Sequence, residues 1–408
     1  MIIKLKNDNL DFSYIINKNP DSGPRIIDCR KGNLIGWFTD PQTYYISFME
    51  GHDESSFGGS DFEYLDVNKF NNPFIINKMI DGMLDGLNTK YDDISDISLE
   101  ISNVNVRDST FQSIKKYFHE FIIQDYPSEN WTNYRCIKIR SYKHTLEYFL
   151  KFVQVVAFYM ALDQDAIYKD DNINKKYFQL ISDIDAPYFI RYLFKQNLLR
   201  NSEKKFYEYQ ELINNSEKYE LNMSPKNNWE SRFDYINSLI PEDSTIIDFG
   251  SGEGRYLTRL AKNHKNYICV DIDPDCQIKC SKKIENNGID NASVVSSIDE
   301  IDKQTVNGCT IIMSEVIEHI ELDKHAEIFK GLLSLKPSQI LITTPNKEFN
   351  PFYGIELRHE DHKFEFTLKQ LSNQIINIFG QNKEISITGI GDTVNNIPTT
   401  WGVCINNI

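Results

Sequence analysis

Two glutamates and a histidine stand close together in segment 314–320, which reads SEVIEHI. Glu315, Glu318 and His319 are spaced i, i+3 and i+4, so on one turn of helix their side chains would share a face. Two carboxylates and an imidazole that converge in this way are ligand types that divalent metal ions take in proteins. The alternative interpretation of the spacing is a solvated acidic helix face.

Two other segments favour the metal site over a plain acidic surface. Downstream, segment 358–362 reads RHEDH, so a second histidine-containing segment could supply a missing ligand. Upstream, the chain contains a glycine-rich loop of the kind that approaches nucleotides. Together the three segments predict a reactive centre.

The glycine-rich loop reads IDFGSGEG and begins as a strand. Gly250, Gly252 and Gly254 would let the backbone turn sharply and approach a ligand without a clash of Cβ atoms. Their G-x-G-x-G spacing differs from the G-x-G-x-x-G of dinucleotide-binding folds and from a Walker loop. Asp248 precedes the loop and suits a ligand with a positive amino group. Asp271 ends the next predicted strand, where an acid can hydrogen-bond the ribose hydroxyls of an adenosyl group.

These features together resemble the S-adenosylmethionine pocket of class I methyltransferases. By this resemblance the acids and glycines of the loop region bind the cofactor, and Ser296 or Ser297, after the third strand, would lie near the adenine. We take Ser297 as the candidate. A tight turn that serves only packing is the alternative interpretation of the glycines.

From residue 244 onward, short apolar strands alternate with helices, and these elements must position the residues named above. The expected strands are 245–249, 267–270, 293–295, 310–313 and 339–343, and the expected helices include 228–240, 256–263, 276–287 and 327–335. Such a βαβ series predicts a mostly parallel, doubly wound sheet, which segments 384–389 and 402–405 could close as an edge hairpin. The expected C-terminal domain, residues 223–408, is therefore an α/β Rossmann-like class I methyltransferase domain.

Residues 1–222 predict a separate α+β domain that precedes it. Segments 1–6, 12–17, 25–29 and 44–48 read as strands, and 74–87, 110–123 and 142–162 as helices. The polar segment 221–228, which contains a proline, is the predicted linker. No catalytic constellation is evident in this first domain, so its expected role is to bind a partner or to regulate.

Composition limits the class of protein. The chain has 408 residues, of which 40% are hydrophobic and 12% aromatic, as is typical of globular domains. A formal net charge of −15 offers no basic face for coating a nucleic-acid backbone, so nucleic acid would be held at a short end or with a partner's help. Seven cysteines without a Cys-x-x-Cys pair predict a reducing, cytoplasmic location, and no apolar run is long enough to cross a membrane.

Three segments, in order, resemble one family: the RNA 3′-terminal ribose 2′-O-methyltransferases, in particular the bacterial RNA-repair branch. The family carries E-V-I-E-H, then T-P-N-x-E-F-N, then R-H-x-D-H-x-F-E-W-T, and this chain has EVIEH, TPNKEFN and RHEDHKFEFT. Phe366 replaces the tryptophan, and Leu368 replaces an arginine after the threonine. The likeness covers residues 225–408 and, more weakly, the segments DFSYIINKNPDSG and VVAFYMALDQD of the first domain.

The resemblance implies four metal ligands, namely Glu315, Glu318, His319 and His362, with His362 favoured over His359. Two carboxylates and two imidazoles suit Mn²⁺ better than Mg²⁺, which prefers oxygen ligands, although Mg²⁺ is possible. A ribose 2′-hydroxyl is a poor nucleophile, and a divalent ion on its oxygen would lower its pKa and hold it in line with the methyl donor.

Four other residues are implied near the reaction. Arg358 and His359 would touch the substrate or a metal-bound water, and Asn346 of the TPN segment is counted with the catalytic residues. Arg232 would match a family arginine close to the site.

The expected function is metal-dependent transfer of a methyl group from S-adenosylmethionine to the 2′-hydroxyl of the 3′-terminal ribose of RNA, in RNA repair. The expected partners are an RNA 3′ end and, by the resemblance, a polynucleotide kinase–phosphatase–ligase; no membrane is expected. A small-molecule O-methyltransferase, for which a catechol offers two adjacent oxygens, is one alternative. An inactive methyltransferase-fold scaffold that binds a repair partner is the other.

Overall fold

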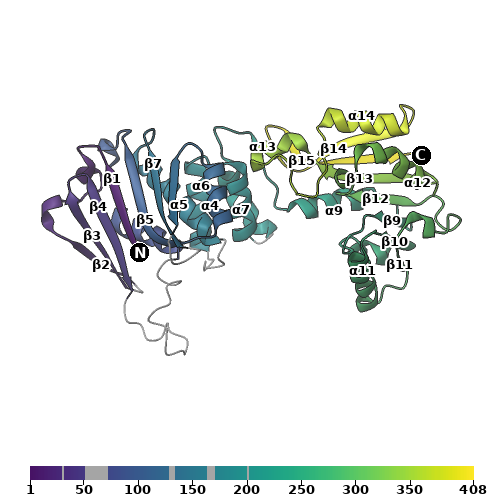
Figure 1. Cartoon of the computed structure of the whole chain (residues 1–408), viewed down its shortest axis with the longest axis horizontal. Coiled ribbons are helices and arrows are strands. Elements are labelled where there is room, and N and C mark those ends of the chain that lie inside the picture. The colour runs from purple at the N-terminus through teal and green to yellow at the C-terminus, as the bar shows by residue number, and fades with distance from the viewer. Residues whose placement is uncertain (30–31, 51–71, 128–133, 163–170, 200–201) are drawn as a thin grey trace. The chain divides into compact units, whose positions relative to one another are not determined.

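The chain folds as two compact units, residues 1–200 and 201–408, and each contains its own sheet (Figure 1). The computed structural model describes residues 1–29, 32–50, 72–127, 134–162, 171–199 and 202–408. Each unit is therefore considered by itself.

The first unit is an antiparallel sheet with helices packed on it. Its strands are β1 (Ile2–Asn7), β2 (Arg25–Cys29), β3 (Gly32–Asp40), β4 (Thr43–Glu50), β5 (Ile97–Asn105), β6 (Ile122–Pro127) and β7 (Tyr134–Ser141). Its helices are α1 (Phe12–Ile15), α3 (Phe74–Leu84), α4 (Asp108–Tyr117), α5 (Leu146–Leu162), α6 (Asp171–Asp183) and α7 (Tyr188–Leu199). The strand order is β2-β3-β4-β1-β5-β7-β6, and every pairing is antiparallel, which confirms the predicted α+β class.

Helix α5 is the core of this unit, as its apolar sequence predicts. Most of its residues are buried, and it packs against α3 and α6. Within the described ranges neither α5 nor another helix has the length and apolar character needed to span a membrane.

Two local predictions in the first unit are wrong. The segment 12–17 was expected to be a strand, but α1 begins at Phe12, and the i, i+3 pair Phe12 and Ile15 is buried on its inner face. The helix expected over 110–123 ends at Tyr117, and Ile122–Pro127 instead pairs with β7 as strand β6. In the second case pairing with the next strand, β7, overrides the local helical spacing.

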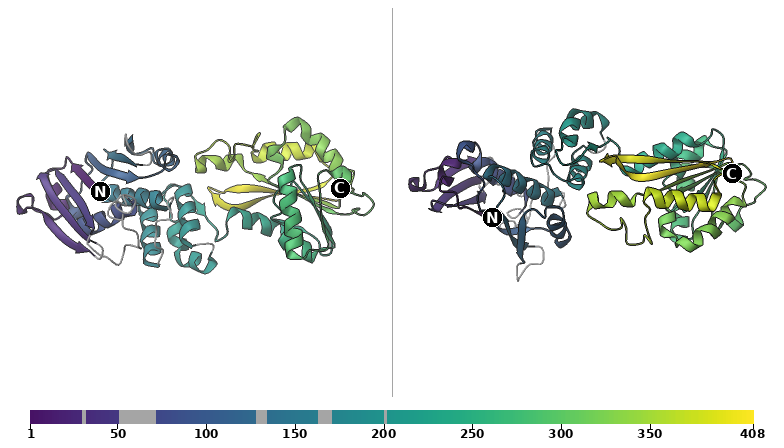
Figure 2. Two further views of the ribbon diagram at one scale, coloured as in Figure 1. Left: turned by 60° about the horizontal axis from the view of Figure 1, so that its bottom comes forward. Right: turned by 90° about the horizontal axis from the view of Figure 1, so that it is seen from above.

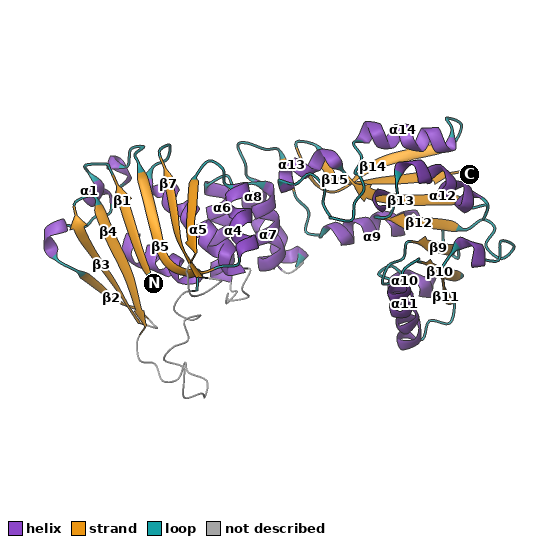
Figure 3. Cartoon of the chain, viewed as in Figure 1, coloured by secondary structure: helices purple, strands orange, loops and turns teal. Residues whose placement is uncertain are grey.

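The second unit is a three-layer α/β/α domain. Its strands are β8 (Leu221–Asn222), β9 (Thr245–Phe249), β10 (Asn266–Val270), β11 (Ala292–Val295), β12 (Thr310–Ser314), β13 (Gln339–Pro345), β14 (Glu384–Val394) and β15 (Ile397–Asn406). Its helices are α8 (Glu203–Asn214), α9 (Asn228–Leu239), α10 (Leu257–Leu260), α11 (Pro274–Asn287), α12 (His325–Leu333), α13 (Asn350–Tyr353) and α14 (Leu368–Phe379). Figure 3 shows the strands in orange between helices drawn in purple.

The strand order of this sheet, β11-β10-β9-β12-β13-β15-β14-β8, confirms the predicted doubly wound topology. The five strands from β11 to β13 are parallel, whereas β15 and β14 are antiparallel additions beyond β13. The predicted hairpin is confirmed, and Figure 2 shows its two long yellow strands side by side. The order in which strands are added to the sheet reverses between the parallel neighbours β9 and β12. Ligands of open α/β sheets bind at the carboxyl ends of the strands beside such a switch point.

The division between the units differs from the predicted one. The sequence places the boundary at 222/223, but the compact units meet at 200/201. The difference arises because β8, the first two residues of the predicted linker, pairs with β14, and Glu220 before it bonds Asn395, so this segment joins the second sheet.

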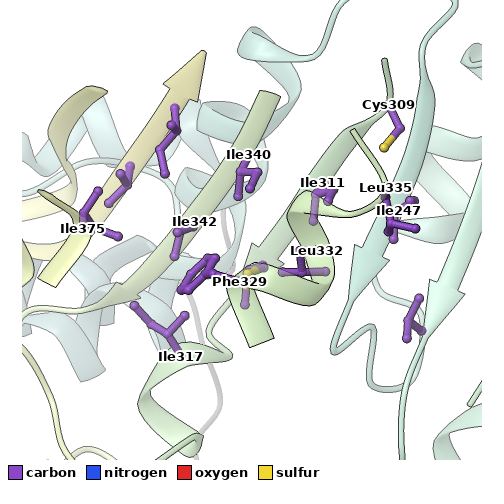
Figure 4. Close-up of a cluster of buried hydrophobic side chains, with 14 of the residues drawn as sticks. Ile247, Cys309, Ile311, Ile317, Phe329, Leu332, Leu335, Ile340, Ile342 and Ile375 are labelled. Atoms are coloured by element: carbon purple, nitrogen blue, oxygen red, sulfur yellow. The ribbon is translucent and has the colours of Figure 1, made fainter. Parts of the chain in front are cut away.

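Alternating residues of the parallel strands fill two cores, one on each face of the sheet. Ile246, Ile312 and Leu341 point to the face covered by α9, α10 and α11. Ile311, Ile340 and Ile342 point to the opposite face, where α12 and α14 pack. Figure 4 shows this second cluster, in which Phe329 of α12 lies among Ile317, Ile342 and Leu332.

A buried histidine in the same layer holds the turn that follows β12. The Nε2 atom of His325 lies 3.1 Å from the carbonyl oxygens of both Ile317 and Ile320. Carbonyls only accept hydrogen bonds, so Nε2 carries the proton, and burial lowers the pKa of His325, which keeps the ring neutral. The Nδ1 atom then accepts from the amide of Gln374 at 3.3 Å. His325 therefore fixes the carbonyls on both sides of Glu318 and His319.

Replacing His325 should loosen this turn. The variant His325→Leu removes the ring donor from both carbonyls, of which that of Ile317 keeps the amide of Ile320 at 3.3 Å, so we expect a loss of about 1–3 kcal/mol in the free energy of unfolding. Hydrogen–deuterium exchange should accelerate in the peptide that covers residues 314–324. Gln374→Leu, which removes only the Nδ1 contact, should have a smaller effect. Wild-type exchange rates in His325→Leu would contradict the assigned role.

Candidate active site

The glycine loop adopts the conformations that glycine is needed for. Gly250, Gly252 and Gly254 have φ values of 72°, 53° and 69°, in the left-handed region. A Cβ atom at Gly250 would lie 2.6 Å from Cγ2 of Val316, which no packing tolerates. The glycine loop and the segment that carries the predicted metal ligands are thus in direct contact.

The two acids predicted for the cofactor lie in different surroundings. Asp271 is half-buried at the end of β10, where Oδ2 accepts from the amide of Gly252 at 2.6 Å and Oδ1 from that of Asp273 at 3.0 Å. Asp248 is buried and accepts from the Tyr267 hydroxyl at 2.7 Å. Burial raises the pKa of Asp248 to about 7. The Asp271 carboxylate is thus the more accessible of the two.

The predicted adenine contact lies at the same edge of the sheet. Ser297 follows β11, the strand next to β10, and accepts from the amide of Asp299 at 3.2 Å at the start of a short 3₁₀ turn. The carboxyl ends of parallel strands meet at one edge, and Val270 pairs with Val295, so Asp271 and Ser297 both follow neighbouring strand ends and are offset by one residue in register. Their contacts with a cofactor stay predictions.

The helix expected over 315–319 is not formed, and this prediction is wrong. The amide of Glu315 donates to the carbonyl of Thr343 at 2.8 Å, so the strand pairing continues to this residue. Glu315 has φ of 57°, a left-handed conformation, and a 3₁₀ turn over Ile317–His319 follows. The chain turns sharply here because Val316 must pack over Gly250. The turn brings Glu318 and His319 to one side.

Three of the four predicted ligands come together. One ligand atom from each of Glu318, His319 and His362 lies within 4.8 Å of the others. The rings of His319 and His362 are perpendicular, with centroids 4.7 Å apart. These three side chains could hold a metal ion.

Glu318 is the buried member of this group. Its side chain has no exposed surface; Oε2 accepts from the Thr344 hydroxyl at 3.0 Å, and Oε1 has no hydrogen-bond partner. Burial raises the pKa of Glu318 well above its usual range, and the charge of Glu315 raises it further. A cation at Oε1 would satisfy the orphaned oxygen and favour the charged form.

Glu315, the fourth predicted ligand, lies beside the group but is held by other residues. Its Oε2 atom forms an ion pair of 3.3 Å with Arg232 of α9, and Oε1 accepts from the Thr343 hydroxyl at 3.2 Å. Successive strand residues point to opposite faces, so Thr343 and Thr344 hold Glu315 and Glu318 on different sides of the strand end. Arg232 thus lies next to a predicted ligand, as expected from the sequence.

A chain of hydroxyl groups continues from Glu315 to the glycine loop. The Thr343 Oγ1 atom lies 2.8 Å from Ser314 Oγ, which lies 2.9 Å from the hydroxyl of Tyr256. Tyr256 precedes α10, the short helix after the glycine loop. The chain of hydrogen bonds therefore links both predicted binding regions.

The loop that carries His362 is ordered by a buried carboxylate. Glu365 accepts from His362 Nδ1 at 2.6 Å, from the amide of Arg358 at 2.7 Å and from Asn350 Nδ2 at 2.5 Å. Because Nδ1 is engaged, Nε2 of His362 is available to a ligand. The amide of Lys363 donates to the carbonyl of Glu318 at 2.8 Å and ties the loop to the turn.

The other three predicted residues occupy different positions. Arg358 points inward, with Nε 3.2 Å from Asn350 Oδ1 and Nη2 bonded to the carbonyl of Thr399. Asn346 is buried and bonds the carbonyl of Pro398 and the amide of Glu348. Both positions favour support of the loop over contact with a substrate. His359 is exposed next to His362, with ring centroids 5.9 Å apart, and its Nδ1 accepts from the amide of Asp361 at 3.3 Å.

Sequence reasoning missed the groups that support the site, namely Tyr256, Ser314, Thr343, Thr344 and Glu365. Hydroxyl residues at the carboxyl ends of parallel strands are a usable signal, because those ends converge. Glu365 lies three residues after His362, yet nothing local indicates that its side chain turns back.

Comparison with known proteins agrees with both units. The family model for the Hen1 N-terminal domain matches residues 2–218, and a methyltransferase domain model matches residues 246–337. The chain is 28% identical over 189 residues to the small RNA 2′-O-methyltransferase of Rattus norvegicus, covering 40% of this chain and 46% of that protein. With the protein of the same description from Tetrahymena thermophila it shares 24% over 199 residues, covering 40% of this chain and 45% of that protein.

The chain spans about half the length of these curated relatives. A chain in a solved structure of the Pnkp1/Rnl/Hen1 complex matches over the whole of both chains, with a TM-score of 0.81 and 22% identity, which shows a shared fold. The Hen1 N-terminal domain model covers more than half of the 408 residues. The chain therefore belongs to the Hen1 family.

Proposed function

We propose that this chain transfers a methyl group from S-adenosylmethionine to the 2′-hydroxyl of the 3′-terminal ribose of RNA, with the help of a divalent metal ion. The observation that carries the proposal is the cluster of Glu318, His319 and His362 at the carboxyl ends of the strands, in contact with a glycine loop. The names of the rat and Tetrahymena relatives support RNA 2′-O-methylation as the activity.

The donor set supports a metal ion of intermediate hardness. Glu318, His319 and His362 would hold it, and Glu315, which lies next to Glu318, would join them if its ion pair with Arg232 opened. Carboxylate and imidazole ligands together favour Mn²⁺ over Mg²⁺. When bound, the ion supplies positive charge that lowers the pKa of a coordinated hydroxyl.

The cofactor would lie along the glycine loop. Asp271 would accept hydrogen bonds from the ribose, the loop glycines would allow close approach, and Ser297 would flank the adenine. The bound cofactor supplies the electrophilic methyl group. Asp248 is buried and bonded to the Tyr267 hydroxyl, so it would support cofactor binding by holding the glycine loop in shape and by adding negative charge near it.

The chain's own residues position the reacting groups. Glu365 fixes the His362 ring, and Thr344 fixes Glu318. His325 fixes the turn that carries Glu318 and His319. Such supporting contacts hold a site in the geometry that the reaction needs before the substrate arrives. His359, exposed beside the cluster, is placed to contact the RNA end.

We propose RNA repair as the setting, with a kinase–phosphatase–ligase as partner. The match to the Pnkp1/Rnl/Hen1 complex over the whole chain supports this proposal for the partner. The first unit, residues 1–200, would then bind the partner or regulate the second unit.

Metal binding and cofactor binding should be separable by mutation. Glu318→Gln removes the charge of the orphaned carboxylate, so kcat should fall on the order of 10²-fold or more while the Kd of the cofactor stays unchanged. Asp271→Asn should instead weaken the cofactor by about tenfold, through the loss of charged hydrogen bonds. Calorimetry with the cofactor and initial rates with a short RNA measure both effects. A parallel loss of cofactor affinity in Glu318→Gln would contradict the separation.

Glu365 should act on metal affinity through His362. Glu365→Gln loses the charge that orients the ring, so we expect the Kd for Mn²⁺, measured by calorimetry without RNA, to rise about 10- to 100-fold. Glu348→Gln, a change of the same type in a neighbouring exposed glutamate, is the matched control. Equal Mn²⁺ affinity in Glu365→Gln and wild type would show that Glu365 only packs the loop.

The structure of the RNA end should decide whether it reacts. RNA with 2′- and 3′-hydroxyls should be methylated, whereas a 2′-deoxy end lacks the nucleophile and a 3′-phosphate blocks the adjacent oxygen. A 3′-deoxy end keeps the nucleophile but loses one oxygen ligand, so its rate should fall roughly 10²-fold. Methyl transfer from labelled cofactor to matched oligonucleotides measures these rates. Methylation of internal riboses, of a catechol in place of RNA, or after exhaustive chelation would contradict the proposal.

A further inference from the structure

A polar pocket in the first unit lies outside the site described above. It has a volume of about 500 Å³ and is lined by Ser13, Tyr14, Asn17, Lys18, Asn19 and Pro20. These residues belong to the segment between α1 and the 3₁₀ turn Pro20–Ser22. Nothing in the methyltransferase site uses this segment.

Lys18 is a half-buried cation without an acidic partner. Its Nζ donates to the carbonyl of Ile16 at 3.0 Å and lies 5.9 Å from the centre of the Tyr44 ring. Among the described residues no carboxylate lies within ion-pair distance of it. Burial lowers the pKa of Lys18 to about 8, and the charge of Arg25 adds to the effect. The ammonium group therefore lacks a counter-charge.

Arg25 does not line the pocket but carries a second positive charge that acts on Lys18. It begins β2, is exposed, and acts electrostatically on both Lys18 and Tyr44. Arg25 likewise forms no ion pair with the residues that the structure describes. Two adjacent unpaired cations contrast with the net charge of −15 and with Lys138 of the same unit, which pairs with Glu100 at 2.7 Å. An anion would neutralise both cations at once.

Two exposed aromatic rings stand at this pocket. Tyr14 lines it, and Tyr91 lies beside Tyr14 with ring centroids 6.1 Å apart. The side chains are 64% and 37% exposed, so their faces are accessible to a ligand. Aromatic faces next to cations are the combination that binds bases and phosphates of single-stranded nucleic acid.

We propose that this pocket binds the phosphate of a nucleotide, with Lys18 and Arg25 on the phosphate and Tyr14 and Tyr91 beside the base. The ligand is a nucleotide unit within an RNA strand or a free nucleotide; the RNA source rests on the proposed function. Ser13 adds a hydroxyl at the rim, whereas Asn17 Nδ2 donates to the carbonyl of Gly86 at 2.7 Å and Asn19 Oδ1 accepts from the amide of Asp21 at 3.0 Å, which hold the loop in shape. Such a site would let an acidic protein bind an RNA strand at a nucleotide other than its reactive 3′ end.

The test is direct binding to the full-length chain without cofactor or metal ion. Fluorescence anisotropy with a labelled single-stranded RNA of about ten nucleotides should show about tenfold weaker binding for Lys18→Gln, because a charge-assisted hydrogen bond is lost. The slope of log K against log salt should decrease by about 0.7 for the lost phosphate contact. Lys18→Arg should restore most of the affinity, and Lys138→Gln should bind like wild type. Thermal unfolding of each variant shows whether it is folded.

Competition distinguishes the two sources of the nucleotide. Displacement by AMP as effective as by unlabelled RNA, per phosphate, would assign the pocket to free nucleotides, whereas displacement by RNA alone would assign it to a strand. Both results support a nucleotide-phosphate site. Equal affinity and salt slope in Lys18→Gln and wild type, for RNA and for AMP, would overturn it.

Chemical labelling localises the site independently of mutation. Pyridoxal 5′-phosphate combines a phosphate with an aldehyde that condenses with a neutral amine to an imine and water, and borohydride reduces the imine to a stable amine. Lys18 should be labelled preferentially near pH 8, where more of it is neutral than of an ordinary lysine. Nucleotide or RNA should protect it, as read by mass spectrometry. Labelling that neither ligand reduces would count against the pocket. This assay involves no methyl transfer, so its failure and the failure of the proposed function are distinguishable.

Discussion

The second unit is built around a carboxylate that has no exposed surface. Glu318 has one oxygen bonded to Thr344 and one with no partner. Burying an uncompensated charge costs several kcal/mol, which no neighbouring group in the described structure offsets fully. The surrounding architecture holds this group in place all the same: His325 fixes the turn, and Lys363 ties the following loop to the Glu318 carbonyl. A cation beside Oε1 would compensate the buried charge of Glu318.

The end of strand β13 positions one acid on each face of the sheet. Thr343 and Thr344 are neighbours in sequence, but the alternation of a strand directs one towards Glu315, Arg232 and α9, and the other towards Glu318. The same alternation separates the two cores of the unit. One pair of adjacent threonines thereby supports two acids in different surroundings, and burial strongly raises the pKa of Glu318.

The sequence predicts the second unit better than the first, and it predicts residue types better than local backbone. The β9 strand and the glycine positions follow from short-range patterns, and so does α11, because each depends on neighbours in sequence. The helix expected at Glu315 is not formed because Glu315 takes a left-handed φ of 57° at the strand end and only Ile317–His319 form a 3₁₀ turn. The spacing of the polar residues indicates neither feature. The convergence of His362 with His319 joins distant segments, and only the family resemblance indicated it. The inward orientation of Arg358 depends on carbonyls of β15, to which no local pattern points.

The loop that carries His362 belongs to no helix or strand, yet it is fixed at several points. Glu365 bonds three groups within the loop and beside it, Arg358 anchors it to β15, and Lys363 joins it to the Glu318 turn. A segment restrained in this way has already lost its conformational freedom on folding. Ligands that dock on it do not have to order it, so the entropy of ordering that usually opposes association is small here. A ligand that binds at this edge of the sheet would therefore meet a preformed, rigid surface.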